Sequence, residues 1–207
     1  PTPQFFEAAE RAIIHSIPKP LALIVCYPSN PTAYVADLDF YKDLVAFAKK
    51  HDIFILSDLA YAEVYFDEDK PPPSVLQVPG ALDVTVEFTS MSKTFSMAGW
   101  RMGFAVGNER IIAALARVKS YLDYGAFTPV QVAATAALNG PDDCIREMRD
   151  TYRKRRDALV ESFGRAGWDI PPPQASMFAW APLPKAFEAV GSMQFATLMV
   201  EKSGVVV

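Results

Sequence analysis

Four short apolar runs, separated by longer stretches with helical periodicity, constrain the fold of this chain more than any other feature. The first run, residues 21–26, is apolar on both faces, as a strand buried inside a parallel sheet should be. Similar runs occupy residues 53–56, 84–89 and 102–106. Strands that alternate with amphipathic helices are typical of α/β proteins, so we expect an α/β fold rather than an all-α or all-β one.

Helical patterns fill the intervals between and after these runs. We expect a helix from Leu38, with Asp37 as its N-cap, because apolar residues follow at helical spacing. Further helices are predicted around residues 111–122, after Pro129, at 145–163 and at 194–202, together with one short strand at 177–180.

The long helical pattern and the proline run behind it indicate how the chain divides. Pro171-Pro172-Pro173 is incompatible with a helix interior. We place a boundary within the long helix, so that residues 1–155 belong to a large domain and residues 156–207 to a smaller one. The chain starts without methionine and stops on Val205-Val206-Val207, which reads as a strand just begun, so we treat it as a fragment.

Charge and composition exclude some classes of partner. The net charge is −4 and the isoelectric point is near 5.2, which argues against nucleic acid or an anionic membrane surface as the main partner. No apolar stretch reaches the roughly 18–20 residues that a membrane span needs. Two cysteines, Cys26 and Cys144, are too few for a disulfide scaffold and fit a reducing cytosol, so we expect a cytoplasmic protein.

Polar side chains follow three of the predicted strands at the point where each strand ends. Asn30 lies just past the first strand, Asp58 ends the second, and Ser90 and Lys93 follow the third. Taken singly, each has an ordinary explanation as a turn, a cap or a surface charge. In open parallel sheets, however, ligands bind beyond the carboxyl ends of the strands, so we expect these groups to form one site.

The residues from Ser90 to Gly103 closely resemble the lysine signature of the class I/II aminotransferases, a fold-type I family that depends on pyridoxal phosphate. As in that family, an arginine, Arg101, follows Lys93 by eight positions. Asp58-Leu59-Ala60-Tyr61 looks like the family's Asp-x-x-Tyr motif, and Ser29-Asn30-Pro31-Thr32-Ala33 looks like its Asn-Pro-Thr-Gly turn. The intervals between the motifs also match, and the resemblance spans essentially the whole chain.

The resemblance implies a fold and a cofactor. It implies a three-layer α/β/α large domain with a mainly parallel sheet, followed by the start of a smaller α+β domain. The cofactor is pyridoxal 5′-phosphate, and no metal is implied. Ala33 stands where the family commonly has glycine, and we expect this departure to be mild because backbone strain is not obligatory there.

The resemblance also assigns catalytic roles. Lys93 would hold the cofactor as a Schiff base and, once freed, would shuttle a proton as a desolvated amine. Asp58 would pair with the pyridine nitrogen and keep it protonated. Tyr61 would hydrogen-bond the phenolic oxygen and favour its ionised form.

The remaining cofactor contacts come from four other residues. Asn30 would join Tyr61 at the phenolic oxygen. Arg101 would bind the phosphate with two parallel hydrogen bonds, Ser90 would add a hydroxyl, and Ser92 is a further candidate for the phosphate.

The function implied is transfer of an amino group between an α-amino acid and a 2-oxo acid, in the manner of alanine or aspartate transaminases. Two alternatives stay open: a lyase or synthase with the same fold and lysine, and a non-catalytic fragment that lacks a complete site. Half-reactions distinguish a transaminase from a lyase. A transaminase converts its cofactor to the pyridoxamine form with an amino acid alone, whereas a lyase releases ammonia or pyruvate.

Family members carry further segments at both ends, including the arginine that binds the substrate's α-carboxylate. We therefore expect this piece to be inactive alone, to expose apolar surface near residues 53–56, and to form a homodimer in the full-length protein.

Overall fold

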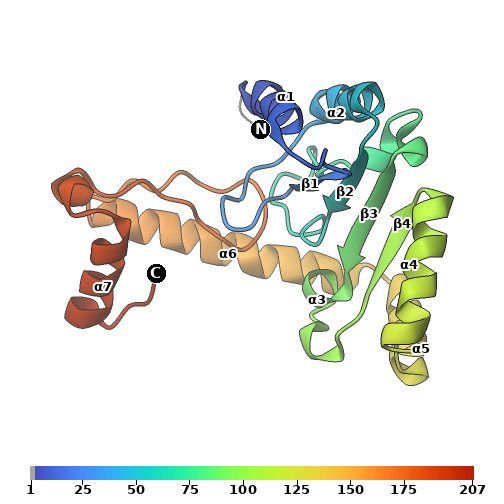
Figure 1. The fold of residues 1–207 in the computed structure, drawn as a ribbon. Coiled ribbons are helices and arrows are strands. Elements are labelled where there is room, and N and C mark those ends of the chain that lie inside the picture. The colour runs from blue at the N-terminus through green and yellow to red at the C-terminus, as the bar shows by residue number, and fades with distance from the viewer. Residues whose placement is uncertain (1–2) are drawn as a thin grey trace.

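A four-stranded sheet lies at the centre of the computed structural model, which describes residues 3–207 (Figure 1). The strands lie in chain order, β1 (Ala22–Cys26), β2 (Phe54–Asp58), β3 (Thr85–Ser90) and β4 (Gly103–Gly107). The first three are parallel, whereas β4 runs antiparallel to β3. The predicted α/β fold with a mainly parallel sheet is confirmed.

Helix α2 (Leu38–His51) covers one face of this sheet and forms the main core with it. Its start is confirmed at Asp37, whose carboxylate accepts a hydrogen bond from the backbone N–H of Phe40 at 2.8 Å. Leu44 on this helix packs with Val25 of β1 and Ile55 of β2 in one buried cluster. Burial of each such aliphatic side chain contributes about 1.5–3 kcal/mol, so this cluster holds α2 against β1 and β2.

The connection from β3 to β4 carries two short helical turns, α3 (Met91–Thr94) and η3 (Ala98–Trp100). Both ends of β4 are glycine because the strand lies very close to β3. A Cβ atom added at Gly103 would come within 2.7 Å of the Thr89 carbonyl oxygen, and one at Gly107 within 2.2 Å of the Thr85 carbonyl oxygen. Only glycine allows this approach.

The other helices lie before β1 and after β4. Those after β4 confirm the predicted patterns, whereas the helix before β1 was not predicted, and α6 links the sheet region to α7 in Figure 1. They are α1 (Phe5–His15), α4 (Glu109–Leu122), α5 (Thr128–Leu138), α6 (Asp143–Arg165) and α7 (Ser192–Ser203), with 3-10 turns η1 (Val75–Gln77), η2 (Ala81–Asp83) and η4 (Lys185–Val190).

The predicted strand at residues 177–180 is wrong. Within the described residues, this part of the chain makes only an isolated bridge, between Ala175 and Tyr65. Ser176 then adopts a left-handed conformation with φ of 66°, which turns the chain away from the line of a strand. Helix α6 continues without a break through residue 155, and the division of the chain there stays a prediction.

The predicted exposure near residues 53–56 is only partly right. Ile53 and Ile55 are buried beneath α2, whereas Phe54, which alternates with them, is 37% exposed. Ile24 of β1, which also points away from α2, is 72% exposed. Among residues 3–207, no helix is long and apolar enough to cross a membrane.

Candidate active site

The loop after β1 brings Asn30 to the side chain of Tyr61, which follows β2. Two backbone hydrogen bonds of 2.9 Å close this loop, from Ser29 N to the Tyr34 oxygen and from Ala33 N to the Ser29 oxygen. The Asn30 amide nitrogen donates to the Tyr61 hydroxyl at 3.5 Å. Two of the motifs predicted to share a site are therefore in contact.

Ala33 closes this loop in a left-handed conformation, with φ of 60°. Such a conformation costs a residue with a Cβ about 1–2 kcal/mol, and glycine avoids the cost. The expectation that alanine brings no obligatory strain at this position is therefore wrong. The loop is held in this shape by the two backbone hydrogen bonds and by the burial of the Ala33 methyl group.

Asp58 is the last residue of β2 and lies opposite Cys26 of β1 in the parallel register. One carboxylate oxygen, Oδ1, accepts a hydrogen bond from the backbone N–H of Ala60 at 3.1 Å. Burial raises the pKa of the Cys26 thiol, and the nearby Asp58 charge raises it further. The sequence alone assigned no role to Cys26. Its place at the end of a predicted strand could have indicated that it lies at the same edge of the sheet as Asp58.

Lys93, which follows β3, approaches the pair formed by Asn30 and Tyr61. The Ser90 hydroxyl, at the end of β3, accepts a hydrogen bond from the backbone N–H of Ser92 at 3.1 Å and so caps the single turn of α3. This turn directs Lys93 so that its Nζ lies 5.7 Å from the centre of the Tyr61 ring. Among residues 3–207, no carboxylate lies within ion-pair distance of this amine.

Tyr61 lies at the centre of this group and is only 6% exposed. Burial raises the pKa of its phenol, while the hydrogen bond from Asn30 acts in the opposite direction. The phenol therefore stays protonated at neutral pH. Because Asn30 donates to the phenol oxygen, the Tyr61 proton remains available for a third group.

Arg101 lies on the exposed surface at the end of η3, apart from the contacts described above. It has a left-handed φ of 53°, and its Nη1 donates to the Ala98 carbonyl oxygen at 3.0 Å. This bond engages only one of its guanidinium donors, which leaves the others for an anion. Among residues 3–207, the Ser92 hydroxyl makes no recorded hydrogen bond, so its predicted phosphate contact stays a prediction.

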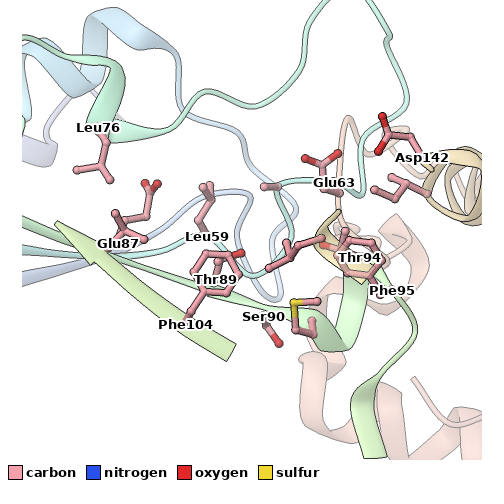
Figure 2. A pocket seen from close by; sticks show the side chains of 15 residues that line it. Leu59, Glu63, Leu76, Glu87, Thr89, Ser90, Thr94, Phe95, Phe104 and Asp142 are labelled. Atoms are coloured by element: carbon pink, nitrogen blue, oxygen red, sulfur yellow. The ribbon is translucent and has the colours of Figure 1, made fainter. Parts of the chain in front are cut away.

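A cavity of about 400 Å³ lies on the β3–β4 side of α3 (Figure 2). Leu59, Thr89 and Phe104 line it, and the carboxylate of Glu87 stands at one side. Of the residues predicted for the cofactor, only Ser90 lines this cavity. The cavity is therefore separate from the group formed by Asn30, Tyr61 and Lys93.

The donor set fits pyridoxal phosphate, whose ring offers a pyridine nitrogen, a phenolic oxygen, a reactive carbonyl carbon and a phosphate. In the described chain, no recorded hydrogen bond engages Asp58 Oδ2, so a carboxylate oxygen is available to the pyridine nitrogen. The Tyr61 proton and the amine of Lys93 are also available, beside each other. A carboxylate, a phenol and a lysine amine at the carboxyl edge of a parallel sheet are groups of the kind that fit this cofactor.

Comparison with known proteins gives the family. Residues 5–207 match the model of a family described as aminotransferase class I and II. The whole chain is 71% identical over 207 residues to the putative aminotransferase AatC of Rhizobium meliloti (strain 1021), of which it covers 51%. It is 50% identical over 203 residues to the glutamate-pyruvate aminotransferase AlaC of Escherichia coli (strain K12), with 98% of this chain and 49% of AlaC covered. The chain belongs to the class I and II aminotransferase family, whose members depend on pyridoxal phosphate.

A solved structure supports the same assignment at the level of the fold. Apo-BacF from Bacillus subtilis superimposes with a TM-score of 0.85 at 39% sequence identity, over 91% of this chain and 47% of BacF. The chain spans about half the length of the relatives that it matches.

Proposed function

We propose that the full-length protein containing this chain transfers an amino group between an α-amino acid and a 2-oxo acid, with pyridoxal phosphate held by Lys93. The observation that carries this proposal is the position of the Lys93 amine beside the hydrogen-bonded pair of Asn30 and Tyr61. Three separate segments of the chain meet there, at the edge of the sheet where Asp58 ends β2.

Asp58, Tyr61 and Lys93 have separate tasks in this reaction. When bound, the cofactor supplies an electron-accepting ring that stabilises negative charge on the substrate's α-carbon. Asp58 would hold a proton on the pyridine nitrogen, and Tyr61 would donate a hydrogen bond to the phenolic oxygen. Lys93 Nζ anchors the cofactor and, once released, moves the proton at the α-carbon, because a desolvated amine is both a nucleophile and a base.

The phosphate contacts come from the segment around α3. Arg101 would offer two parallel N–H donors to phosphate oxygens, and the hydroxyls of Ser90 and Ser92 would add neutral hydrogen bonds. A charged bidentate contact is roughly twice as strong as a neutral hydrogen bond, so Arg101 contributes most to retention of the cofactor.

The substrate pair that we propose is glutamate and pyruvate, because the 50% identical relative AlaC is named a glutamate-pyruvate aminotransferase. We also propose that the full-length protein is a cytoplasmic homodimer. A lyase or synthase that uses the same lysine is the second candidate, but no relative reported above carries such a name.

The test uses the full-length protein, its Lys93→Ala variant and a Lys42→Ala control at an exposed lysine. With pyridoxal phosphate, wild type and control should show a visible absorption band, and borohydride should fix the cofactor onto Lys93, identified by peptide mass. Addition of glutamate or alanine should then bleach the band to the pyridoxamine form. If Lys93→Ala behaves like wild type, the anchor assignment fails. If free ammonia is released over repeated turnovers from a single amino acid, the lyase alternative holds.

A further inference from the structure

Tyr61 has a third neighbour besides Asn30 and Lys93, and this neighbour comes from the C-terminal part of the chain. The ring of Phe178 stands edge-on to the Tyr61 ring, with the ring centres 5.6 Å apart and the planes at 72°. This is a favourable arrangement for two aromatic side chains, since the positive edge of one ring meets the negative face of the other.

Phe178 is brought there by backbone pairing with the segment that follows Tyr61. Ser176 N donates to the Val64 oxygen at 2.7 Å, and Phe66 N donates to the Gln174 oxygen at 3.2 Å. Ser176 is completely buried, and its hydroxyl accepts a hydrogen bond from the backbone N–H of Phe178 at 3.3 Å. The position of Phe178 is therefore defined relative to the segment that carries Tyr61.

Helix α6 fastens the other side of that segment. Arg149 donates through Nε to the Glu63 carbonyl oxygen at 2.9 Å and also forms an ion pair with the Glu63 carboxylate. Its guanidinium lies over the Tyr65 ring, 3.9 Å from the ring centre. The backbone from Glu63 to Phe66 is thus held on two sides, whereas the Tyr61 side chain projects beyond these contacts.

The hydrogen bond from Asn30 is too weak to orient Tyr61 by itself. At 3.5 Å between nitrogen and oxygen, it lies at the outer limit for a hydrogen bond, where the attraction has already weakened. The Lys93 Nζ lies 5.7 Å from the centre of the Tyr61 ring. Once attached to the cofactor, Lys93 would no longer carry a free ammonium group to attract the ring. The edge-on contact with Phe178 supplies a further limit on rotation of the Tyr61 ring.

We propose that Phe178 is a positioning residue for Tyr61, holding the phenol ring where its hydroxyl is shared with Asn30 and reaches the cofactor's phenolic oxygen. The contact between the Tyr61 hydroxyl and the cofactor's phenolic oxygen rests on the proposed function. The role of Phe178 also makes the C-terminal part of the chain responsible for an interaction within the cofactor site, through packing rather than through a polar group.

The test measures the pH midpoint of the visible cofactor band in the full-length protein. Tyr61→Phe should raise this midpoint, because a hydrogen bond to the ionised phenolic oxygen is lost. Phe178→Leu should raise it in the same direction, by about two- to tenfold in the ionisation constant, the range expected for one aromatic pair. In the Tyr61→Phe background, Phe178→Leu should have no further effect. Phe178→Tyr, which keeps the ring, should restore the wild-type midpoint.

The matched control is Trp180→Leu, because Trp180 lies in the same segment but is 57% exposed and makes no recorded aromatic contact within the described chain. It should leave the midpoint unchanged. An equal shift by Phe178→Leu in both backgrounds, or no shift in either, would overturn the proposal.

A second measurement separates this proposal from the proposed function. If the wild-type protein shows no cofactor band, the proposed function fails. The packing is then tested by a double-mutant cycle with Tyr61→Ala and Phe178→Ala, read by chemical denaturation without cofactor. The two changes should be coupled by about two- to tenfold in the unfolding equilibrium constant, and independent effects would contradict the proposal.

Discussion

Glu87 of β3 shows how a single buried carboxylate can connect two strands of the sheet to a neighbouring helical turn. Its carboxylate is buried and accepts three hydrogen bonds, from the Ser74 hydroxyl at 2.6 Å, the Ser57 hydroxyl at 3.2 Å and the backbone N–H of Val75 at 3.2 Å. It thereby joins β2 and β3 to the start of η1. Burial nevertheless raises the pKa of this carboxyl, because three neutral donors do not fully replace water around a charge.

The raised pKa predicts a pH dependence of stability. The folded protein holds the Glu87 proton to a higher pH than the unfolded chain does, so the stability from this group is complete below the usual carboxyl pKa of about 4.5 and is lost as pH rises through the folded value. Relative to wild type, Glu87→Gln should become steadily more stable across that window. Chemical denaturation of the full-length protein at a series of pH values measures the difference.

Two further variants serve as controls for this prediction. Glu147→Gln removes the same charge at an exposed position of α6. Glu87→Leu should cost about 2–4 kcal/mol at low pH, because it leaves buried donors without an acceptor, and this cost should fall as pH rises through the same window. A difference between wild type and Glu87→Gln that does not change with pH would contradict the prediction.

At the scale of elements, α6 is held to the rest of the molecule by arginines. Arg149 contacts Glu63 and Glu68, and Arg153 also pairs with Glu68, at 2.8 Å. Arg156 lies over the Phe66 ring, 4.6 Å from its centre. These contacts fall on one side of the helix and all reach the segment after Tyr61, so α6 supports the candidate site without contributing to it directly.

Removal of Arg149 should therefore destabilise the fold far more than removal of an exposed arginine. Its side chain is only 11% exposed. We expect Arg149→Ala to cost about 2–4 kcal/mol, since the change removes a largely buried guanidinium together with its hydrogen bond to the Glu63 carbonyl oxygen and its packing over the Tyr65 ring. Arg149→Lys should recover only part of this, because an ammonium group cannot reproduce the planar fork. Denaturant unfolding of the full-length protein measures both.

The control lies on the same helix. Arg165 pairs with Glu161 at 3.1 Å, but both side chains are about 70% exposed. Arg165→Ala should change the stability by less than about 0.5 kcal/mol, because exposed ion pairs are screened by water. Equal costs at Arg149 and Arg165 would show that the contacts to Glu63 and Glu68 are unimportant.

At the scale of the whole molecule, much apolar surface faces outward. Ile24 is exposed on the sheet, and Tyr121, Leu122 and Phe127 are each at least 75% exposed near the end of α4 and the start of α5. Soluble monomers rarely expose so many large apolar side chains close together, and such surfaces are typical of interfaces.

The isolated 207-residue chain should therefore self-associate or aggregate. Light scattering as a function of concentration measures this, and a Leu122→Glu variant should shift the distribution towards smaller species, because a charge on the apolar surface opposes contact. Val207→Glu, a charge of the same kind at the end of the chain, is the control. A monodisperse monomer at all concentrations would contradict the prediction.

The local pattern of the sequence predicts most of the elements and the candidate site. Buried parallel strands are short apolar runs, helices repeat their apolar residues at 3.6-residue spacing, and a cap such as Asp37 lies next to the helix that it starts. The motifs around Asn30, Asp58 and Lys93 are equally local, so they could be recognised without any knowledge of packing.

Only the tertiary structure decided the features that depend on residues far apart in the chain. The left-handed backbone at Ala33 follows from a closed loop, the burial of Ile55 but not Phe54 follows from α2 covering one face, and the failed strand at 177–180 follows from the turn at Ser176. The contact between Tyr61 and Phe178 joins residues more than a hundred positions apart. Local periodicity predicts which face of an element is apolar. Which element covers that face is determined by the free energy of packing, and this depends on contacts throughout the chain.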